Sequence, residues 1–316
     1  MEQRRIYRLG RGFILFWTLF LVSTTAFAQE DRNLRIANKL YDELSYPAAI
    51  HYFQKALKKK FNFEAMTKVA ESYRLIKDYD NAEKWYNYVV NTNYVRPEDR
   101  LRYGQVLMVR QKYEMALEQF DKYVELRPED ERGAKLIRAC EQYQQVRDNP
   151  ADYKIKNLAI NSDQSDFCAV RFEDGIVFSS SRGAGKLIER TYNWDGNPFL
   201  DLYFVEDKSE KADEVEEGKE PNIAFGKPRL FKSKFNGKFH EAVACFDEGH
   251  ELIFFTRNNY KSGKKKTSQE GLVHLSIYYA ELEKGGWTNM KPLPFNSEEH
   301  SVGHPTVTND GTTLYF

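Results

Sequence analysis

The chain has 316 residues and a formal net charge of zero, with 47 Lys and Arg against 47 Asp and Glu. This balance gives no global electrostatic reason to expect binding to nucleic acid. A hydrophobic content of 41% and an aromatic content of 15% exclude wholesale disorder, and the length suggests about two domains. Cys140, Cys168 and Cys245 are too scattered for a disulfide framework or a zinc site, so we expect buried small hydrophobic residues.

Residues 1–28 have the organisation of a secretory signal peptide. Four arginines lie within the first 11 residues, an uncharged run follows, and Ala26 and Ala28 supply the small residues that a signal peptidase reads. An uncleaved anchor is the alternative, but the strongly apolar part is only about half of the ~20 residues that a spanning helix needs. The sequence therefore predicts export, cleavage before Gln29 and a mature chain that does not span the membrane.

Residues 29–148 show a repeat with helical spacing. Alanines step by 33 and then 34 residues, an aromatic residue follows each alanine four positions later, and a small residue precedes it by twelve. Small residues at these positions let two antiparallel helices approach closely, while the aromatic side chains fill the groove toward the next pair. The residues are Ala37, Ala49 and Phe53, then Ala70, Ala82 and Tyr86, then Gly104, Ala116 and Phe120.

This pattern resembles the tetratricopeptide repeat, a 34-residue helix-turn-helix unit. The resemblance implies an all-α solenoid of three repeats over residues 29–148, closed by a capping helix over residues 131–146. In the register of that family, Asn38, Glu71 and Gln105 on the first helix of each pair are presented to the face that binds partner proteins. An ordinary solvated helix face is the alternative, and the class of ligand stays open.

The remaining residues, 149–316, follow the helix-breaking pair Asn149 and Pro150 and alternate as strands do. An acidic residue followed by Gly separates two β-rich runs at Gly175, Gly249 and Gly311, as in hairpins where Gly takes a positive φ. Recurrence of one hairpin predicts sheets in series, which is typical of a β-propeller. Since propellers need roughly four to eight blades, we expect residues 149–316 to be an incomplete propeller whose chain continues further.

Three phrases carry a closer resemblance: RTYNWDGNPFLDLYF, FTRNNY and LPFNSEEHSVGHPTVTNDGTTLYF. They resemble the TolB/WD-type propeller of an exported OmpA-family protein of Bacteroidota. That resemblance implies an α+β multidomain protein of the periplasm, associated with the outer membrane and with type IX secretion or gliding machinery. It also implies a C-terminal domain that binds peptidoglycan, whose residues are absent from this sequence.

No motif for catalysis stands out. The serine triplet of Ser179, Ser180 and Ser181 is not the Gly-x-Ser-x-Gly elbow of hydrolases. His300 and His304 have helical zinc-ligand spacing, but Gly303 between them and the proline that follows argue against a helix. We therefore expect no catalytic, metal or cofactor site.

The sequence thus predicts a non-catalytic exported scaffold that binds envelope proteins and no nucleic acid. The alternative is a hydrolase or glycan-binding envelope protein with a pocket in the propeller. Two charged segments, residues 206–220 and 261–266, are expected to be solvated loops.

Overall fold

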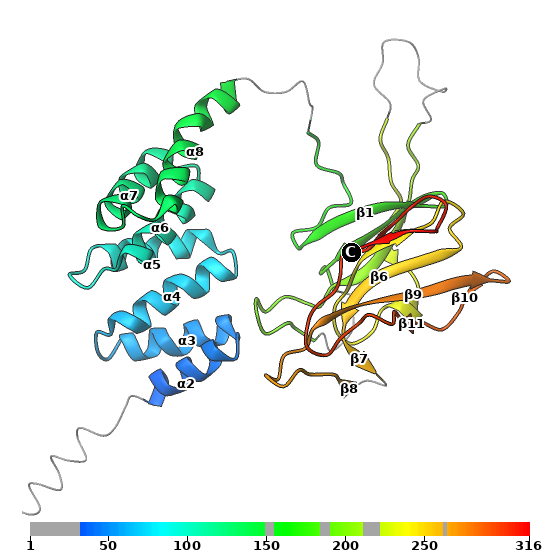
Figure 1. Ribbon diagram of the computed structural model, residues 1–316, viewed down its shortest axis with the longest axis horizontal. Helices are drawn as coiled ribbons and strands as arrows, with labels where there is room; N and C mark the ends of the chain where they lie inside the picture. Colours follow the sequence, from blue (N-terminus) through cyan, green and yellow to red (C-terminus); the bar gives the residue numbers. More distant parts are fainter. Residues whose placement is uncertain (1–31, 149–154, 184–189, 211–221, 262–263) are drawn as a thin grey trace, which may run out of the picture. The chain divides into compact units, whose positions relative to one another are not determined.

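The computed structural model describes residues 32–148, 155–183, 190–210, 222–261 and 264–316. The predicted signal peptide and most of the acidic loop 206–220 lie outside these residues. The chain forms two compact units, one of residues 1–153 with 193–195 and one of residues 154–192 with 196–316 (Figure 1). Within the described residues, no helix has both the length and the apolar character needed to cross a bilayer.

The described part of the first unit contains seven helices that pack in consecutive pairs, forming an array like that of tetratricopeptide repeats (Figure 1). The first helices of the pairs are α2, α4 and α6, the second helices are α3, α5 and α7, and α8 packs on α7 at the end. Their bounds are α2 Arg32–Asp42, α3 Tyr46–Leu57, α4 Phe63–Leu75, α5 Tyr79–Val90, α6 Pro97–Val109, α7 Tyr113–Leu126 and α8 Glu131–Asp148.

Each turn within a pair depends on one residue with left-handed backbone: Leu44, Lys77 and Gln111 have φ of 59°, 63° and 59°. The next residue donates its N–H to a carbonyl five residues earlier, over 2.8–2.9 Å, in all three turns. This is the Schellman arrangement that satisfies the last carbonyls of a helix. The left-handed residue recurs at the same position of each repeat, although its residue type differs each time.

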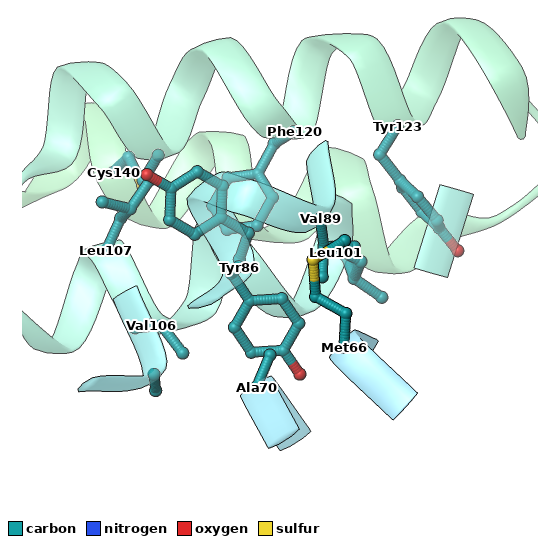
Figure 2. Close-up of a cluster of buried hydrophobic side chains, with 13 residues drawn as sticks. Met66, Ala70, Tyr86, Val89, Leu101, Val106, Leu107, Phe120, Tyr123 and Cys140 are labelled. Carbon is teal, nitrogen blue, oxygen red and sulfur yellow. The ribbon is translucent and has the colours of Figure 1, made fainter. Parts of the chain in front are cut away.

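The predicted close approach of the helices is present. A Cβ atom on Gly104 would lie 2.3 Å from Cε1 of Phe120, so only glycine fits there without a shift. Tyr86 and Phe120 are fully buried in the cluster that links the second and third pairs (Figure 2). The small and aromatic residues read from the sequence therefore form the core of the array.

The second unit consists of antiparallel strands. The first sheet has the order β1-β2-β3-β4, and the second has the order β5-β6-β9-β10 with β11 also paired to β9. Two further hairpins, β7-β8 and β12-β13, complete the described strands, which do not close into a ring. The bounds are β1 Asp166–Phe172, β2 Gly175–Ser180, β3 Asp201–Glu206, β4 Arg229–Leu230, β5 Glu241–Phe246, β6 Leu252–Asn258, β7 Tyr260–Lys261, β8 Lys264–Lys265, β9 Leu275–Glu283, β10 Gly286–Trp287, β11 Lys291–Pro292, β12 Thr306–Val307 and β13 Leu314–Tyr315.

The two sheets are stacked in series on apolar cores. One core joins Phe172, Phe204 and Phe231 of the first sheet region to Phe255 and Trp287 of the second. A separate core on the second sheet contains side chains from β5, β6 and β9 together with Val307 of β12 and Leu314 of β13. The second sheet thus buries both faces.

The predicted hairpins lie where the sequence places them, but the glycine prediction is correct only at Gly311, whose φ is +70°. In the other two turns the left-handed residues are Glu173 and His250, with φ of 49° and 55°. Gly175 is needed for space instead, because a Cβ there would lie 2.2 Å from the carbonyl oxygen of Val205. The expectation of positive φ at Gly175 and Gly249 was therefore wrong.

The first strands of both sheets carry a bulge. The pairing register shifts between Phe167 and Val170 in β1, and between Ala242 and Ala244 in β5. Cys168 and Val243 lie at these shifts with φ of 53° and 50°, and His304 just before β12 has φ of 56°. The position is repeated although glycine occupies none of the three sites.

Cys168 is also exposed, unlike Cys140 and Cys245, so the prediction of burial was wrong for this cysteine.

The third strand of each sheet is held by an asparagine clamp. Asn236 accepts the N–H of Leu202 over 2.7 Å and donates to its carbonyl over 3.1 Å. Asn296 does the same to Ile277 in β9, over 2.9 Å and 2.7 Å. Because the clamped residues occupy corresponding places in the two sheets, the clamp belongs to the repeat. In the first sheet, Asn236 directly follows a 3-10 turn over Ser233–Phe235, which comes after β4.

Candidate functional site: the first-helix face of the array

Polar side chains of the first helices of the array, together with α8, lie on one face, and hydrogen bonds and ion pairs connect many of them. We call it the first-helix face. Its members are Arg35 and Asn38 of α2, Lys68 and Glu71 of α4, Glu98, Arg102 and Gln105 of α6, and Arg132 of α8. The three residues predicted from the sequence to contact a partner all belong to it.

Asn38 is half-buried and connected to the next first helix. Its Oδ1 accepts a hydrogen bond from Nζ of Lys68 over 2.7 Å. The same ammonium group lies 4.9 Å from the ring centroid of Tyr41 and 5.9 Å from that of Phe53. A cation over two aromatic rings is held in place, so Lys68 is a pre-positioned charge on this face.

Glu71 is the centre of the face and is only 6% exposed. Its carboxylate accepts two hydrogen bonds from Arg74, at 2.6 and 2.8 Å, and one from the hydroxyl of Tyr86 at 2.6 Å. It also forms an ion pair with Arg102 at 3.0 Å. Burial opposes ionisation, but the hydrogen bonds from Arg74 and Tyr86 outweigh it and hold the pKa of Glu71 below its ordinary value. Glu71 therefore orders neighbouring cations, and a direct contact of its carboxylate with a partner stays a prediction.

The face continues through α6 to α8. Glu98 lies 3.8 Å from Arg102 and 3.1 Å from Arg132, whose guanidinium also pairs with Asp130 at 2.7 Å. Gln105 follows Arg102 by three residues on α6, is half-buried, and has no hydrogen-bond partner in the described part of the chain. Its amide is thus available on a face whose other side chains are largely paired.

Sequence reasoning overlooked the cations. Arg35, Lys68 and Arg102 stand three residues before Asn38, Glu71 and Gln105, at the same spacing of 33 and 34 residues as the core alanines. This constant offset is the signal that could have revealed them, since residues three apart share a helix face. With Arg74 and Arg132, the face and its immediate partners contain five basic and three acidic groups, so its charge favours an acidic ligand.

The serines of the triplet and His304 have partners within the fold. Oγ of Ser179 accepts the N–H of Val243 over 2.8 Å, Oγ of Ser180 accepts from Arg182, and Oγ of Ser181 accepts the N–H of Ser165. His304 uses its backbone N–H, which donates to Oγ1 of Thr256 over 2.8 Å. Among the described residues, no group of three or more His, Cys, Asp or Glu side chains could hold a metal ion.

One serine–histidine pair occurs on the surface of the second unit. Nδ1 of His274 lies 3.1 Å from Oγ of Ser301, which also accepts the N–H of Leu275. A hydrolase needs a third group to orient the histidine and donors for an oxyanion. The hydroxyl here instead links β9 to the segment before β12.

A buried glutamate of the second sheet also has hydrogen-bond partners within the fold. Glu241 accepts hydrogen bonds from Tyr260 at 2.6 Å and from the N–H of Gly237 at 2.9 Å, and pairs with Arg257 at 3.0 Å. Burial raises the pKa of Glu241 to about 7, against the opposing effect of these donors. The acid is fully buried, and its contacts link β5 to Gly237 and to the side chains of Arg257 and Tyr260.

The fold and this face define the class of the protein: a helical repeat array of the tetratricopeptide type joined to a unit of stacked antiparallel sheets. Neither a protein-family model nor a curated protein matches the chain. Among solved structures, the first tetratricopeptide domain of human RPAP3 is 23% identical, covers 38% of this chain and 94% of its own, and has a TM-score of 0.33.

Two other solved structures give similar values. The Sgt2 tetratricopeptide domain from Aspergillus fumigatus is 18% identical, with coverage of 41% of this chain and 90% of its own and a TM-score of 0.32. The C-terminal part of a repeat-containing protein from Cytophaga hutchinsonii is 24% identical, with coverage of 36% and 45% and a TM-score of 0.32.

Proposed function

We propose that the chain is a non-catalytic scaffold whose first-helix face binds an extended, acidic segment of a partner protein. The observation that carries this proposal is the repeated cation at Arg35, Lys68 and Arg102, which gives the face one basic group at the same position of each repeat. An extended acidic peptide offers carboxylates at a regular spacing and matches such a row. Arrays of stacked repeats present long surfaces suited to peptides of this kind.

The wider setting is also part of the proposal. The predicted signal peptide supports export to the periplasm, and the resemblance to OmpA-family proteins supports a place near the outer membrane with secretion or gliding machinery. The two stacked sheets share bulge and clamp positions, which supports sectors of a β-propeller as their architecture. A second partner surface on the propeller, and attachment to peptidoglycan through a further domain, belong to the same proposal.

Peptide binding to the mature chain, beginning at Gln29, tests the proposal. Fluorescence anisotropy with a labelled polyglutamate peptide should show saturable binding, and a polylysine peptide should not bind. The double variant Arg35→Gln and Lys68→Gln should weaken polyglutamate binding about fivefold or more, since each exposed ion pair contributes roughly 0.5–1 kcal/mol.

The control replaces three exposed lysines elsewhere, Lys264, Lys265 and Lys266, by glutamine in the second unit. It should leave polyglutamate binding unchanged. Equal loss in both variants would show that binding follows total charge and would refute a role for the first-helix face.

A further inference from the structure

One edge of the helical array combines a basic run with unburied aromatic side chains. Lys58, Lys59 and Lys60 follow α3 and are all exposed. Phe61 comes next and is 56% exposed, and Tyr94 in the α5–α6 connection is 64% exposed. The two rings lie 6.0 Å apart, so the connections of two successive repeats meet here. We call these five residues the basic–aromatic edge.

The inner part of this region has a clear structural role. Phe63 packs partly into the core of the array, and its ring lies 5.8 Å from Tyr94. The guanidinium of Arg96 lies 5.2 Å from the centroid of Phe63 and pairs with Glu64 at 2.9 Å and Asp99 at 3.1 Å. These contacts fix the α5–α6 connection and leave the outer rings of Phe61 and Tyr94 largely in water.

Folding accounts for only part of the edge. Lysines at the end of α3 are favoured by the helix dipole, but one or two suffice for that effect. The pair of aromatic rings gains little from packing while more than half exposed, and exposed aromatic groups beside a cluster of one charge sign mark interaction surfaces. Phe61 and Tyr94 occupy the same position of successive repeats, and Pro128 takes that position in the third, so the edge is confined to the first two repeats.

We propose that the basic–aromatic edge binds an anionic lipid surface. Lysines near an anionic bilayer gain attraction to its headgroups, and aromatic rings next to them partition into the interfacial layer. The proposal concerns a surface formed by interhelical connections and is independent of peptide binding by the first-helix face.

The backbone of the edge argues for lipid over an acidic peptide. The N–H of Lys58 donates to the carbonyl of Gln54, and those of Lys59 and Lys60 donate to that of Ala56. Asn62 uses its Oδ1 to cap the N–H of Ala65 at the start of α4. A peptide recognised by backbone pairing would need N–H donors that the fold does not already use, whereas a bilayer needs only exposed charge and exposed apolar side chains.

Vesicle co-sedimentation of the mature chain, beginning at Gln29, tests the proposal. Vesicles of equal parts phosphatidylglycerol and phosphatidylcholine should retain the protein, and vesicles of phosphatidylcholine alone should not. Replacing Lys58, Lys59 and Lys60 by glutamine should lower the partition coefficient about 100-fold, since each lysine near the surface contributes about fivefold. The double variant Phe61→Ser and Tyr94→Ser should lower it about tenfold without altering its salt dependence.

Two matched variants keep the result specific. The triple glutamine variant of Lys264, Lys265 and Lys266 carries the same charge change, and Tyr88→Ser removes another ring that is 59% exposed. Both should bind vesicles like the wild type, and circular dichroism should show all variants folded. Equal binding to both vesicle types, or wild-type binding by the Lys58–Lys60 variant, would overturn the proposal. Loss of polyglutamate binding in that variant without vesicle binding by the wild type would assign the edge to an acidic protein instead.

Discussion

Removal of an asparagine clamp gives a local and measurable loss of stability. Asn236 and Asn296 each make two hydrogen bonds to the backbone of one residue, Leu202 and Ile277, which are both fully buried. Asn236→Ala or Asn296→Ala removes the acceptor of one buried N–H and one of the two donors to the carbonyl. The carbonyl of Leu202 keeps the N–H of Phe231 at 2.9 Å, and that of Ile277 keeps the N–H of Leu293 at 3.2 Å. The N–H then depends on whatever water can enter.

The size of the loss follows mainly from the unpaired N–H. A buried polar group without a partner costs about 1–3 kcal/mol, and water entering the space of the lost amide recovers part of it. We expect each variant to lose about 1–3 kcal/mol of stability around the third strand. At about 1.4 kcal/mol for each factor of ten, this corresponds to roughly 5- to 150-fold faster amide exchange.

Amide hydrogen exchange measures this effect at the strand concerned. In Asn236→Ala, the amide of Leu202 should lose protection while that of Ile277 in the other sheet changes much less, and Asn296→Ala should do the reverse. Asn259→Ala is a matched control, because Asn259 donates one long side-chain hydrogen bond, at 3.3 Å to Ser297. Unchanged protection of Leu202, or an equal loss in the control, would refute the clamp as a source of stability.

Three further variants test other contacts. Gly104→Ala forces a methyl group against Phe120, so thermal unfolding followed by circular dichroism should show a loss of about 1–3 kcal/mol, and an unchanged melting temperature would contradict the close approach. Burial opposes ionisation of Asp166, but hydrogen bonds from Arg182 and serine partners outweigh it and lower the pKa of this carboxyl to about 2. The ionised carboxylate therefore adds about 2 kcal/mol to the free energy of unfolding. This contribution is present above the unfolded pKa of ~3.9 and is lost as the pH falls toward 2. The variant Asp166→Asn should lack this acid-sensitive part in urea titrations, and an identical pH profile would count against it. Thr256→Val removes the acceptor for the N–H of His304 and should cost about 1–3 kcal/mol, whereas Thr256→Ser should cost less than half as much in the same titrations.

The helical array could be predicted from its sequence because each repeat uses the same small and aromatic residues for the same contact. Ala82 and Tyr86 recur in type and in spacing, and their burial is the direct consequence. The turns could not be predicted this way. Leu44, Lys77 and Gln111 share only their position, and each accepts a strained backbone because the helices on both sides are fixed by the core.

The sequence predicted on which helices the candidate-site residues lie, but not how deeply they are buried or which side chains they contact. The family register placed Asn38, Glu71 and Gln105 on the first helix of each pair, where the structure has them, and their contact with a partner stays a prediction. Spacing alone could not show that Glu71 is buried among Arg74, Arg102 and Tyr86. Burial depends on how closely two pairs of helices pack, and that distance is set by side chains from other repeats. The row of cations, by contrast, was visible in the sequence as a constant offset.

The same limit applies to the sheets, where sequence indicated hairpins but not what joins one sheet to the next. A bulge turns one backbone N–H away from its own ladder, so that group needs an acceptor elsewhere. The N–H of Val243 in the second sheet finds Oγ of Ser179 in the first, and the N–H of His304 finds Oγ1 of Thr256 in the second.

Ser179 and Thr256 occupy corresponding places in β2 and β6, opposite Phe167 and Ala242 at the bulges. Each sheet therefore supplies the acceptor that the next one requires. A sheet of this kind leaves a polar backbone group unsatisfied when it stands alone, which favours repetition in series over an isolated sheet. A hydroxyl residue in the second strand, rather than the glycine of the turn, is thus the part of the sequence repeat that couples one sheet to its neighbour.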